Sequence, residues 1–321
     1  MEAPADPRIL PAPKGLAQCF SRGVRAIVAR PGIVALAVLA IAAAQAPQYA
    51  MQARAEALAD HAQDAAGALG GRTPGPDEAL EQLRVLGGAC GWTCMGLAYG
   101  LVVVVPVLAG ACIAVARAVA GDASARDVGC AFGPRFGPVF VTGLATALVG
   151  GGAVMMVGIV AAAGGVSRAG NLMDGIVGPG VVRATLAVVV LVTAWLTARL
   201  WFALPRAADP RRPRVSGVAA VLESWTATEG AGQWQVLALL AASVAFTVAC
   251  MMPGTAMLAD AIERTADVAP AWAVVALGGC VGVAFGLAML GAAYESLMPA
   301  PMRPPPPPPA VPHSPAPGAS R

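Results

Sequence analysis

The residues of this sequence with the clearest chemical potential are arginines and tryptophans that cluster between positions 195 and 234. The candidates stand at the end of an apolar segment or in the loop after it: Arg199, Trp201, Arg206, Arg211, Arg212, Arg214 and Trp225. Basic side chains beside aromatic rings are typical of a membrane boundary, where they anchor a helix and attract anionic headgroups. We therefore predict that these residues bind a lipid headgroup or another anion, with simple anchoring of the helix as the alternative. Glu223 is a candidate ion-pair partner for Arg199 across the loop.

Among the cysteines, Cys90 and Cys94 are spaced like two ligands on one face of a helix. This spacing suits a metal ion, but no histidine or further cysteine lies nearby in the sequence. Small side chains at a helix interface are the favoured interpretation. The sequence therefore predicts no metal site and no cofactor.

The motifs that support catalysis inside a membrane are missing from the sequence. It contains neither His-Glu-x-x-His nor Gly-x-Ser-x-Gly, and no Walker loop that would drive transport with ATP. The two histidines, His61 and His313, fall outside the apolar segments, which also lack paired carboxylates. We therefore predict a protein that is not an enzyme. A channel or a lipid-handling protein stays open, because either can function with backbone and hydroxyl groups.

Long apolar segments must position these residues. Apolar residues make up 57% of the 321 residues and charged residues only 12%. A membrane-spanning helix needs about 20 mostly apolar residues. The segments that meet this requirement are about 32–50, 92–116, 137–163, 182–204, 233–253 and 271–294. The sequence therefore predicts an all-α, polytopic membrane helix bundle of about six transmembrane helices, with short interfacial helices on the cytoplasmic side.

The distribution of basic residues predicts the orientation of the bundle. Fifteen of the 21 Lys and Arg residues fall in the N-terminal arm, the second-to-third and fourth-to-fifth connections and the C-terminal tail. Because positively charged loops stay in the cytoplasm, we predict an inner (plasma) membrane protein with both termini cytoplasmic. For the N-terminus an alternative is open: Arg22–Arg30, the apolar residues 33–44 and Ala44–Ala46 resemble a signal peptide with a small-residue cleavage site.

The predicted organisation has three parts. Residues 1–31 form a cytoplasmic N-terminal arm with an interfacial helix, residues 32–296 form the six-helix transmembrane domain, and residues 297–321 form a disordered, proline-rich cytoplasmic tail. The outer loop 51–91 is predicted to extend the first span and, after a break at 72–76, to form a short helix lying over the bundle.

Short amphipathic stretches precede three of the spans, at residues 16–22, 128–132 and 221–225. Each combines apolar positions at helical spacing with an aromatic residue, and we predict that each forms a helix in the inner membrane interface.

Glycines at four-residue spacing predict where helices pack closely. They are Gly278, Gly282 and Gly286 in the sixth span, and Gly96 and Gly100 in the second. Such spacing lets two backbones approach each other, either inside the bundle or between protomers. Packing inside the bundle is the favoured interpretation.

The segment after the fourth span carries a family resemblance. An aromatic and arginine-rich helix end and a short basic loop precede Gly217-x3-Val221-Leu222-x-Ser224-Trp225, followed by Gly230 and Trp234. This pattern resembles the membrane-domain family associated with glycerophosphoryl diester phosphodiesterases, and related bacterial six-span proteins of unknown function. The resemblance implies a six-helix integral membrane domain that is sometimes fused to a catalytic barrel. The chain has no room for that barrel, so the resemblance brings no catalytic residues.

The sequence thus predicts a non-enzymatic, bacterial-type integral inner-membrane protein that acts as a membrane accessory, scaffold or lipid-associating module. The alternative is a passive transporter or channel for a small or amphiphilic solute. The expected partners are membrane lipids, with anionic headgroups at the cytoplasmic rim, and a second copy or another membrane protein. No nucleic-acid partner is expected.

Overall fold

The computed structural model describes residues 15–68, 75–149, 152, 179–264 and 267–298, and all regular secondary structure within these ranges is helical. The predicted all-α fold class is confirmed. The predicted C-terminal tail and the second half of the predicted third span fall outside the described residues.

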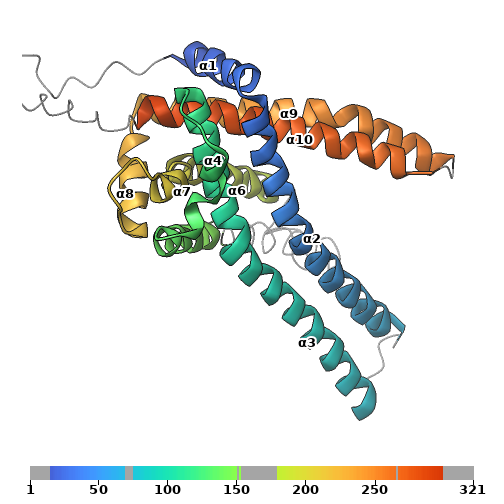
Figure 1. Cartoon of the computed structure of the whole chain (residues 1–321). Helices are drawn as coiled ribbons and strands as arrows, with labels where there is room; N and C mark the ends of the chain where they lie inside the picture. The colour runs from blue at the N-terminus through green and yellow to red at the C-terminus, as the bar shows by residue number, and fades with distance from the viewer. Residues whose placement is uncertain (1–14, 69–74, 150–151, 153–178, 265–266, 299–321) are drawn as a thin grey trace, which may run out of the picture.

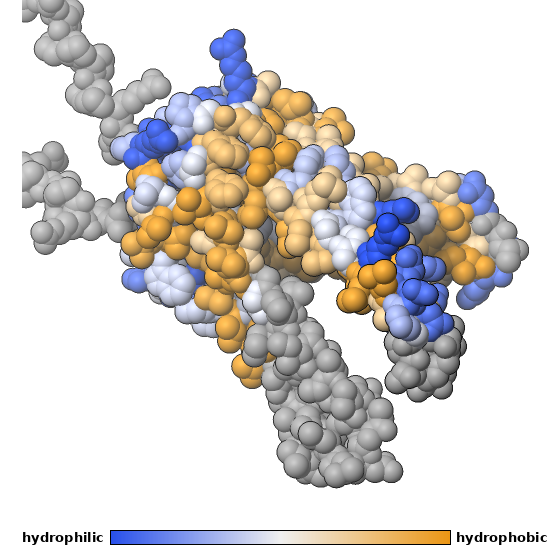
Figure 2. Space-filling model, turned by 90° about the horizontal axis from the view of Figure 1, so that it is seen from below, coloured by the Kyte–Doolittle hydropathy of each residue, from blue (hydrophilic) through white to orange (hydrophobic). Residues whose placement is uncertain are grey.

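Five described helices are long and apolar enough to cross a membrane: Pro31–Ala65, Pro76–Ala120, Ala187–Ala208, Gly232–Glu263 and Ala269–Leu297. A sixth candidate is the bent pair Ala125–Phe132 and Phe136–Val149, whose helices meet at 79°. Apolar side chains cover much of the face shown in Figure 2, and many large ones, such as Leu148 and Leu191, are exposed on these helices. Helices of this length and hydropathy, with this much exposed apolar surface, are typical of membrane spans. The chain is therefore a multi-pass membrane protein.

The described chain begins with α1 (Leu16–Ala29) and α2 (Pro31–Ala68). Pro31 occupies the first position of α2, where its missing N–H removes no helical hydrogen bond. α2 continues through Pro47 and far beyond the first predicted span. The first part of the predicted outer loop is therefore an extension of the first span, as expected.

The next segment is one continuous helical stretch made of α3 (Pro76–Tyr99), η1 (Gly100–Val104) and α4 (Val105–Ala120). The predicted short helix lying over the bundle is wrong, because α3 runs directly into the second span. The reason is that residues 78–84 all favour helix strongly, and Gly88 does not end the helix but lies within it, against Leu58 of α2.

A π-helical turn interrupts this stretch at η1, where the Val105 N–H donates to the Gly100 carbonyl five residues back. Pro106 has no N–H for the regular bond to the residue four positions back, and the wider turn accommodates that loss. The side chain of Gln48 in α2 lies beside this π-helical turn, because a methyl group on Gly100 would be 2.9 Å from Gln48 Nε2.

The following elements are short. α4 ends at Gly121, whose φ of 91° favours glycine. The 3-10 helix η2 (Ala125–Phe132) comes next, and the Ser124 N–H at its start donates to Asp127 Oδ2 at 2.7 Å. The helix Phe136–Val149 follows after a turn.

The second half of the chain begins with α6 (Pro179–Leu200), α7 (Ala203–Ala208) and α8 (Gly217–Ala227). The Ser216 hydroxyl caps α8 by accepting from the Ala219 N–H at 3.1 Å. The three predicted amphipathic stretches thus lie in α1, η2 and α8, all of which are helical.

The last two helices, α9 (Ala231–Glu263) and α10 (Ala269–Leu297), form a long antiparallel hairpin (Figure 1). A methyl group on Gly278 would lie 2.2 Å from the Cys250 carbonyl oxygen, so only glycine fits there. The other predicted packing glycines also lie against neighbouring side chains: Gly282 against Thr247, Gly286 against Ser243, Gly96 against Met51 and Gly100 against Gln48.

The α2–α3 hairpin and the α9–α10 hairpin diverge from a common region that contains α4, α7 and α8 (Figure 1). The largest buried side chains gather there, among them Ile113, Phe202, Met289 and Tyr294. We call the part formed by η2, α7, α8, the loop between α7 and α8, and the last two turns of α10 the basic end.

Candidate functional site

Segments that the sequence predicts on one side of the membrane meet in and around the basic end. Arg30, which follows α1, donates to the Gly121 carbonyl after α4 at 3.2 Å. Arg135, which follows η2, donates to the Arg212 carbonyl in the loop after α7 at 2.6 Å. Segments far apart in the sequence therefore meet at one end of the molecule, as they must if they share one side of a membrane.

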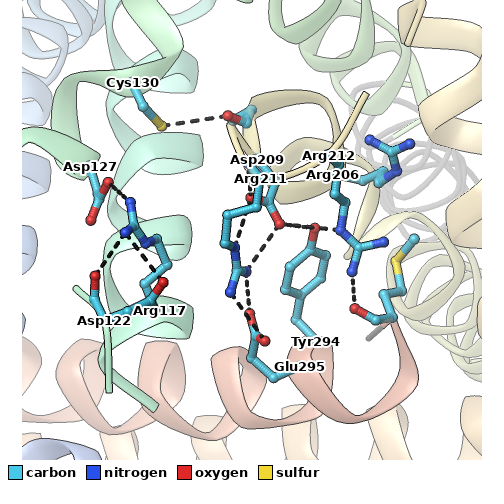
Figure 3. Close-up of polar contacts among 12 residues, drawn as sticks. Arg117, Asp122, Asp127, Cys130, Arg206, Asp209, Arg211, Arg212, Tyr294 and Glu295 are labelled. Atoms are coloured by element: carbon cyan, nitrogen blue, oxygen red, sulfur yellow. Dashed lines mark hydrogen bonds and ion pairs between the residues drawn. The ribbon is translucent and has the colours of Figure 1, made fainter. Parts of the chain in front are cut away.

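Asp209, at the end of α7, is the centre of this region and is fully buried. Its carboxylate accepts from Arg211 Nε at 3.0 Å and Nη2 at 3.1 Å, and from Arg212 Nε at 3.2 Å. The Tyr294 hydroxyl of α10 donates to the same carboxylate at 3.1 Å, as Figure 3 shows. A buried charge is tolerated only when it is paired and hydrogen-bonded, and Asp209 meets both conditions.

The end of α10 completes the cluster. Arg211 bridges Asp209 and Glu295, and its Nη1 lies 3.4 Å from Glu295 Oε2. Arg212 donates to the Met298 carbonyl, and its guanidinium carbon lies 5.3 Å from the centre of the Tyr294 ring. We call Asp209, Arg211, Arg212, Tyr294 and Glu295 the Asp209 cluster. It fastens the loop after α7 to the last turn of α10.

Arg206 forms a separate pair in the same region. It is 5% exposed and donates from Nε and Nη2 to the Glu223 carboxylate of α8. The predicted pairing of Glu223 with Arg199 is therefore wrong. Glu223 and Trp225 are two positions apart, so their side chains lie on different sides of α8, and Arg199 instead donates to the Trp225 carbonyl at 3.0 Å.

Arg199 lies against two tryptophan rings that contact each other edge to face, with centres 5.3 Å apart. Its guanidinium carbon is 5.5 Å from the centre of the Trp195 ring and 5.1 Å from that of Trp225. Aromatic faces attract a cation, so these rings hold the charge in place. Its buried Nε has no hydrogen-bond partner among the described residues.

A second ionic cluster surrounds Arg117 of α4 (Figure 3). Arg117 pairs with Asp127 of η2, and its Nη2 lies 3.3 Å from Asp122 Oδ2. It also donates to the Asp122 carbonyl at 2.8 Å. This cluster fixes the turn that connects α4 to η2.

An open groove of about 440 Å³ lies beside the Asp209 cluster, lined by Gly137, Pro138, Val141, Arg214, Val215, Ser216 and Gly217. The amino ends of the helix Phe136–Val149 and of α8 both border it. Their close approach requires Gly217, where a methyl group would lie 2.8 Å from Val141. Two helix amino ends and the exposed Arg214 provide positive potential, and none of the lining residues is acidic. We call this the Arg214 groove.

A smaller cavity of about 160 Å³ lies between α4, the helix Phe136–Val149, α6 and α7, lined by Leu108, Cys112, Thr146, Val149, Thr197, Leu200, Trp201, Leu204 and Pro205. Two threonines provide its hydroxyl groups, and the other lining side chains are apolar or a cysteine. The lining therefore suits an apolar group better than a hydrated ion.

The structure thus divides the predicted headgroup-binding residues among different environments. Arg206, Arg211 and Arg212 pair with carboxylates inside the protein. Arg199 and Trp225 stack together, Trp201 lines the apolar cavity, and Arg214 lines the groove.

The sequence analysis missed the residues that organise the region: Arg135, Asp209 and Tyr294. A signal for Asp209 was present, because it is a lone acid within a run of arginines. Nothing in the sequence marks Tyr294, since its partner lies 85 positions away.

The charge of Asp209 makes the stability of the protein depend on pH. Burial alone raises the pKa of its carboxyl group, but hydrogen bonds and charge from Arg211, with the charge of Arg212, place that pKa below the ordinary range. The unfolded value is about 3.9. The folded pKa is lower, so the stabilisation is present above about pH 4 and is lost as the pH falls through the folded pKa.

We therefore expect the melting temperature of the protein in detergent to decrease when the pH is lowered below about 4. The fall should be smaller in Asp209→Asn, which has no charge to lose, and unchanged in Asp64→Asn, whose carboxyl group is exposed on α2. Identical acid profiles for the wild type and Asp209→Asn would contradict this assignment.

Cys90 and Cys94 are both exposed on α3. The ranges that the structure describes contain no group of three His, Cys, Asp or Glu side chains that would hold a metal ion.

Comparison of the chain with protein-family models, with curated proteins and with solved structures finds no significant match. The resemblance to the glycerophosphoryl diester phosphodiesterase membrane-domain family therefore stays a prediction that rests on the sequence pattern.

Proposed function

We propose that this chain is a non-enzymatic accessory protein of the inner membrane that associates with anionic lipids through the Arg214 groove. The observation that carries the proposal is the groove itself, where two helix amino ends and an exposed arginine converge without an acidic lining residue. A phosphate oxygen is the group that such an arrangement binds best.

The ion pairs of the neighbouring arginines also favour Arg214 as the residue that binds the headgroup. Arg206, Arg211 and Arg212 are mostly buried and have carboxylate partners, so their charges are largely compensated before any lipid arrives. Arg214 is exposed, and no ion pair of its side chain occurs among the described contacts. Of the basic side chains in this loop, it is therefore the one best suited to attract an anionic headgroup.

The rigid basic end suits an accessory or scaffold role. Ion pairs and hydrogen bonds hold α7, α8, η2 and α10 together, while the interior of the described bundle is rich in alanine, valine and glycine. A passive channel or transporter for a small polar solute would require a continuous polar path, whereas the cavity between α4 and α6 is mainly apolar. We therefore favour lipid association over transport.

Arg214→Gln tests the proposal. A basic residue near an anionic membrane contributes about 1 kcal/mol of attraction, so the anionic lipid retained during purification should fall about fivefold. Mass spectrometry of the extracted lipid measures this quantity. The melting temperature should stay unchanged, because the side chain is exposed.

Arg126→Gln is the matched control, since Arg126 is also exposed at the basic end but does not line the groove. Retention of anionic lipid should stay near the wild-type level in this variant. Equal retention in Arg214→Gln and the wild type would exclude the groove as the headgroup site. Equal losses in both arginine variants would indicate a diffuse charge effect instead.

A further inference from the structure

α3 carries an apolar stripe that no described element covers. Its members are separated alternately by three and four residues: Leu80, Leu83, Gly87, Cys90, Cys94 and Leu97. All six positions are exposed, and the three leucines are 68%, 67% and 60% exposed in that order. Alternation of three and four residues is the spacing of the a and d positions in a coiled coil, where each position faces a partner helix.

The α3 stripe begins outside the hydrocarbon layer. The register of the hairpin follows from two contacts, because methyl groups on Gly88 and Gly96 would lie 3.4 Å from Leu58 and 3.6 Å from Met51 of α2. By this register Leu83 is level with Asp64, which is exposed. Charged side chains at that level require water, so membrane lipid does not cover the leucines there.

The outer faces of α2 and α3 differ in charge. The outer half of α2 exposes Arg54, Glu56, Asp60 and Asp64, which are predominantly acidic. The flank of the α3 stripe carries Glu81 and Arg84, which pair with each other at 3.9 Å. Glu81 and Arg84 are the charged residues of α3 between Leu80 and Leu97, whereas Asp77 and Glu78 precede the stripe. An identical helix would thus meet repulsion on the α2 face but no net charge along the length of the α3 stripe.

We propose that the α3 stripe is the interface of a homodimer in which two copies of α3 pair side by side in parallel. The stripe is about 26 Å long and passes from the water-exposed end of the hairpin into the apolar span. Its partner must be a helix that makes the same passage at the same depth. A second copy in the same membrane orientation presents an identical stripe at the same level by symmetry.

The side chains of the α3 stripe suit this pairing. Leucines at its two ends pack against their counterparts, as at the core positions of coiled coils. Gly87, Cys90 and Cys94 in the middle are small, which permits close approach of the two helices as they enter the bilayer. A two-fold axis then places each Cys90 opposite the Cys90 of the second copy.

Cysteine cross-linking in native membranes tests the proposal. In Cys94→Ser, oxidation with copper phenanthroline should convert most of the chain into a covalent dimer through Cys90. The control is Cys90→Ser/Cys94→Ser/Met95→Cys, because Met95 is exposed on α3 away from the α3 stripe. It should give a much lower yield of dimer. Equal yields from the two variants, or a cross-linked product with the mass of a different protein, would refute the homodimer.

A second variant measures the interface without oxidation. Leu83→Arg should weaken dimerisation in detergent by on the order of a hundredfold, because the symmetric interface loses two leucines and gains two like charges. Light scattering measures the mass. The melting temperature of the monomer should stay unchanged, since Leu83 is exposed. Ala59→Arg, on the outer face of α2, should leave dimerisation intact. A wild-type protein that is monomeric in both membranes and detergent, or a Leu83→Arg dimer of full affinity, would overturn the proposal.

Discussion

Asp209→Ala is expected to cause the largest loss of stability of the substitutions considered, about 3–5 kcal/mol, which is the usual cost of removing one partner from a buried ion pair. Without the carboxylate, Arg212 has no acidic partner, Arg211 keeps only Glu295, and the Tyr294 hydroxyl loses its acceptor. The loop after α7 is then held to the end of α10 only through Glu295 and the Met298 carbonyl. Thermal unfolding of the purified protein in detergent measures the loss.

Two further variants separate the effect of the lost Asp209 charge from the effect of the lost side-chain volume. Asp209→Asn keeps the shape and can still accept hydrogen bonds, so it should lose less stability than Asp209→Ala. Asp64→Ala removes an exposed carboxylate and should stay within about 0.5 kcal/mol of the wild type. If Asp209→Ala melts like Asp64→Ala, the Asp209 cluster does not hold the basic end together.

The membrane fold was predictable because its signal is local and strong. A spanning helix satisfies its own backbone hydrogen bonds and needs only an apolar stretch of sufficient length, so each span is encoded by contiguous residues. The structure places membrane-length apolar helices over five of the predicted spans and a shorter helix over the first half of the third, whose second half lies outside the described residues. What the sequence did not reveal is how far a helix continues past the apolar stretch. α3 begins well before the second predicted span, because residues 78–84 are Glu, Ala, Leu, Gln and Arg, which all favour helix strongly.

The basic end was predictable only in part, and the reason is the distance between partners in the sequence. The run of arginines indicated a polar boundary. Whether an arginine faces lipid or a carboxylate depends on residues elsewhere in the chain, such as Glu295, which meets Arg211 across 84 positions. Glu223 illustrates the same limit at shorter range, since α6, α7 and α8 fold so that it faces Arg206 and not Arg199. Composition therefore located the region, while tertiary contacts decided the role of each residue.

The glycine contacts give a prediction in which neighbouring positions have opposite outcomes. Gly278→Ala should destabilise the α9–α10 hairpin by about 1–3 kcal/mol, because the added methyl group would lie 2.2 Å from the Cys250 carbonyl oxygen and the helices must separate. The clash is with backbone atoms, so no change of rotamer relieves it. Thermal unfolding in detergent, and the yield of folded protein, measure the effect.

Gly279→Ala is the matched control one residue further along α10. Its added methyl group finds no atom nearer than Met251 Sδ at 4.0 Å, and alanine favours helix over glycine by up to about 1 kcal/mol. This variant should therefore be as stable as the wild type or more so. Gly286→Ala should behave similarly, because its methyl group would meet Ser243 at an ordinary 3.4 Å. Gly278, Gly282 and Gly286 share one spacing in the sequence but differ in what an added methyl group would meet: main-chain atoms at Gly278, the Thr247 side chain at 2.4 Å at Gly282, and an ordinary contact at Gly286. Equal stability of Gly278→Ala and Gly279→Ala would show that α9 and α10 do not cross closely at this point.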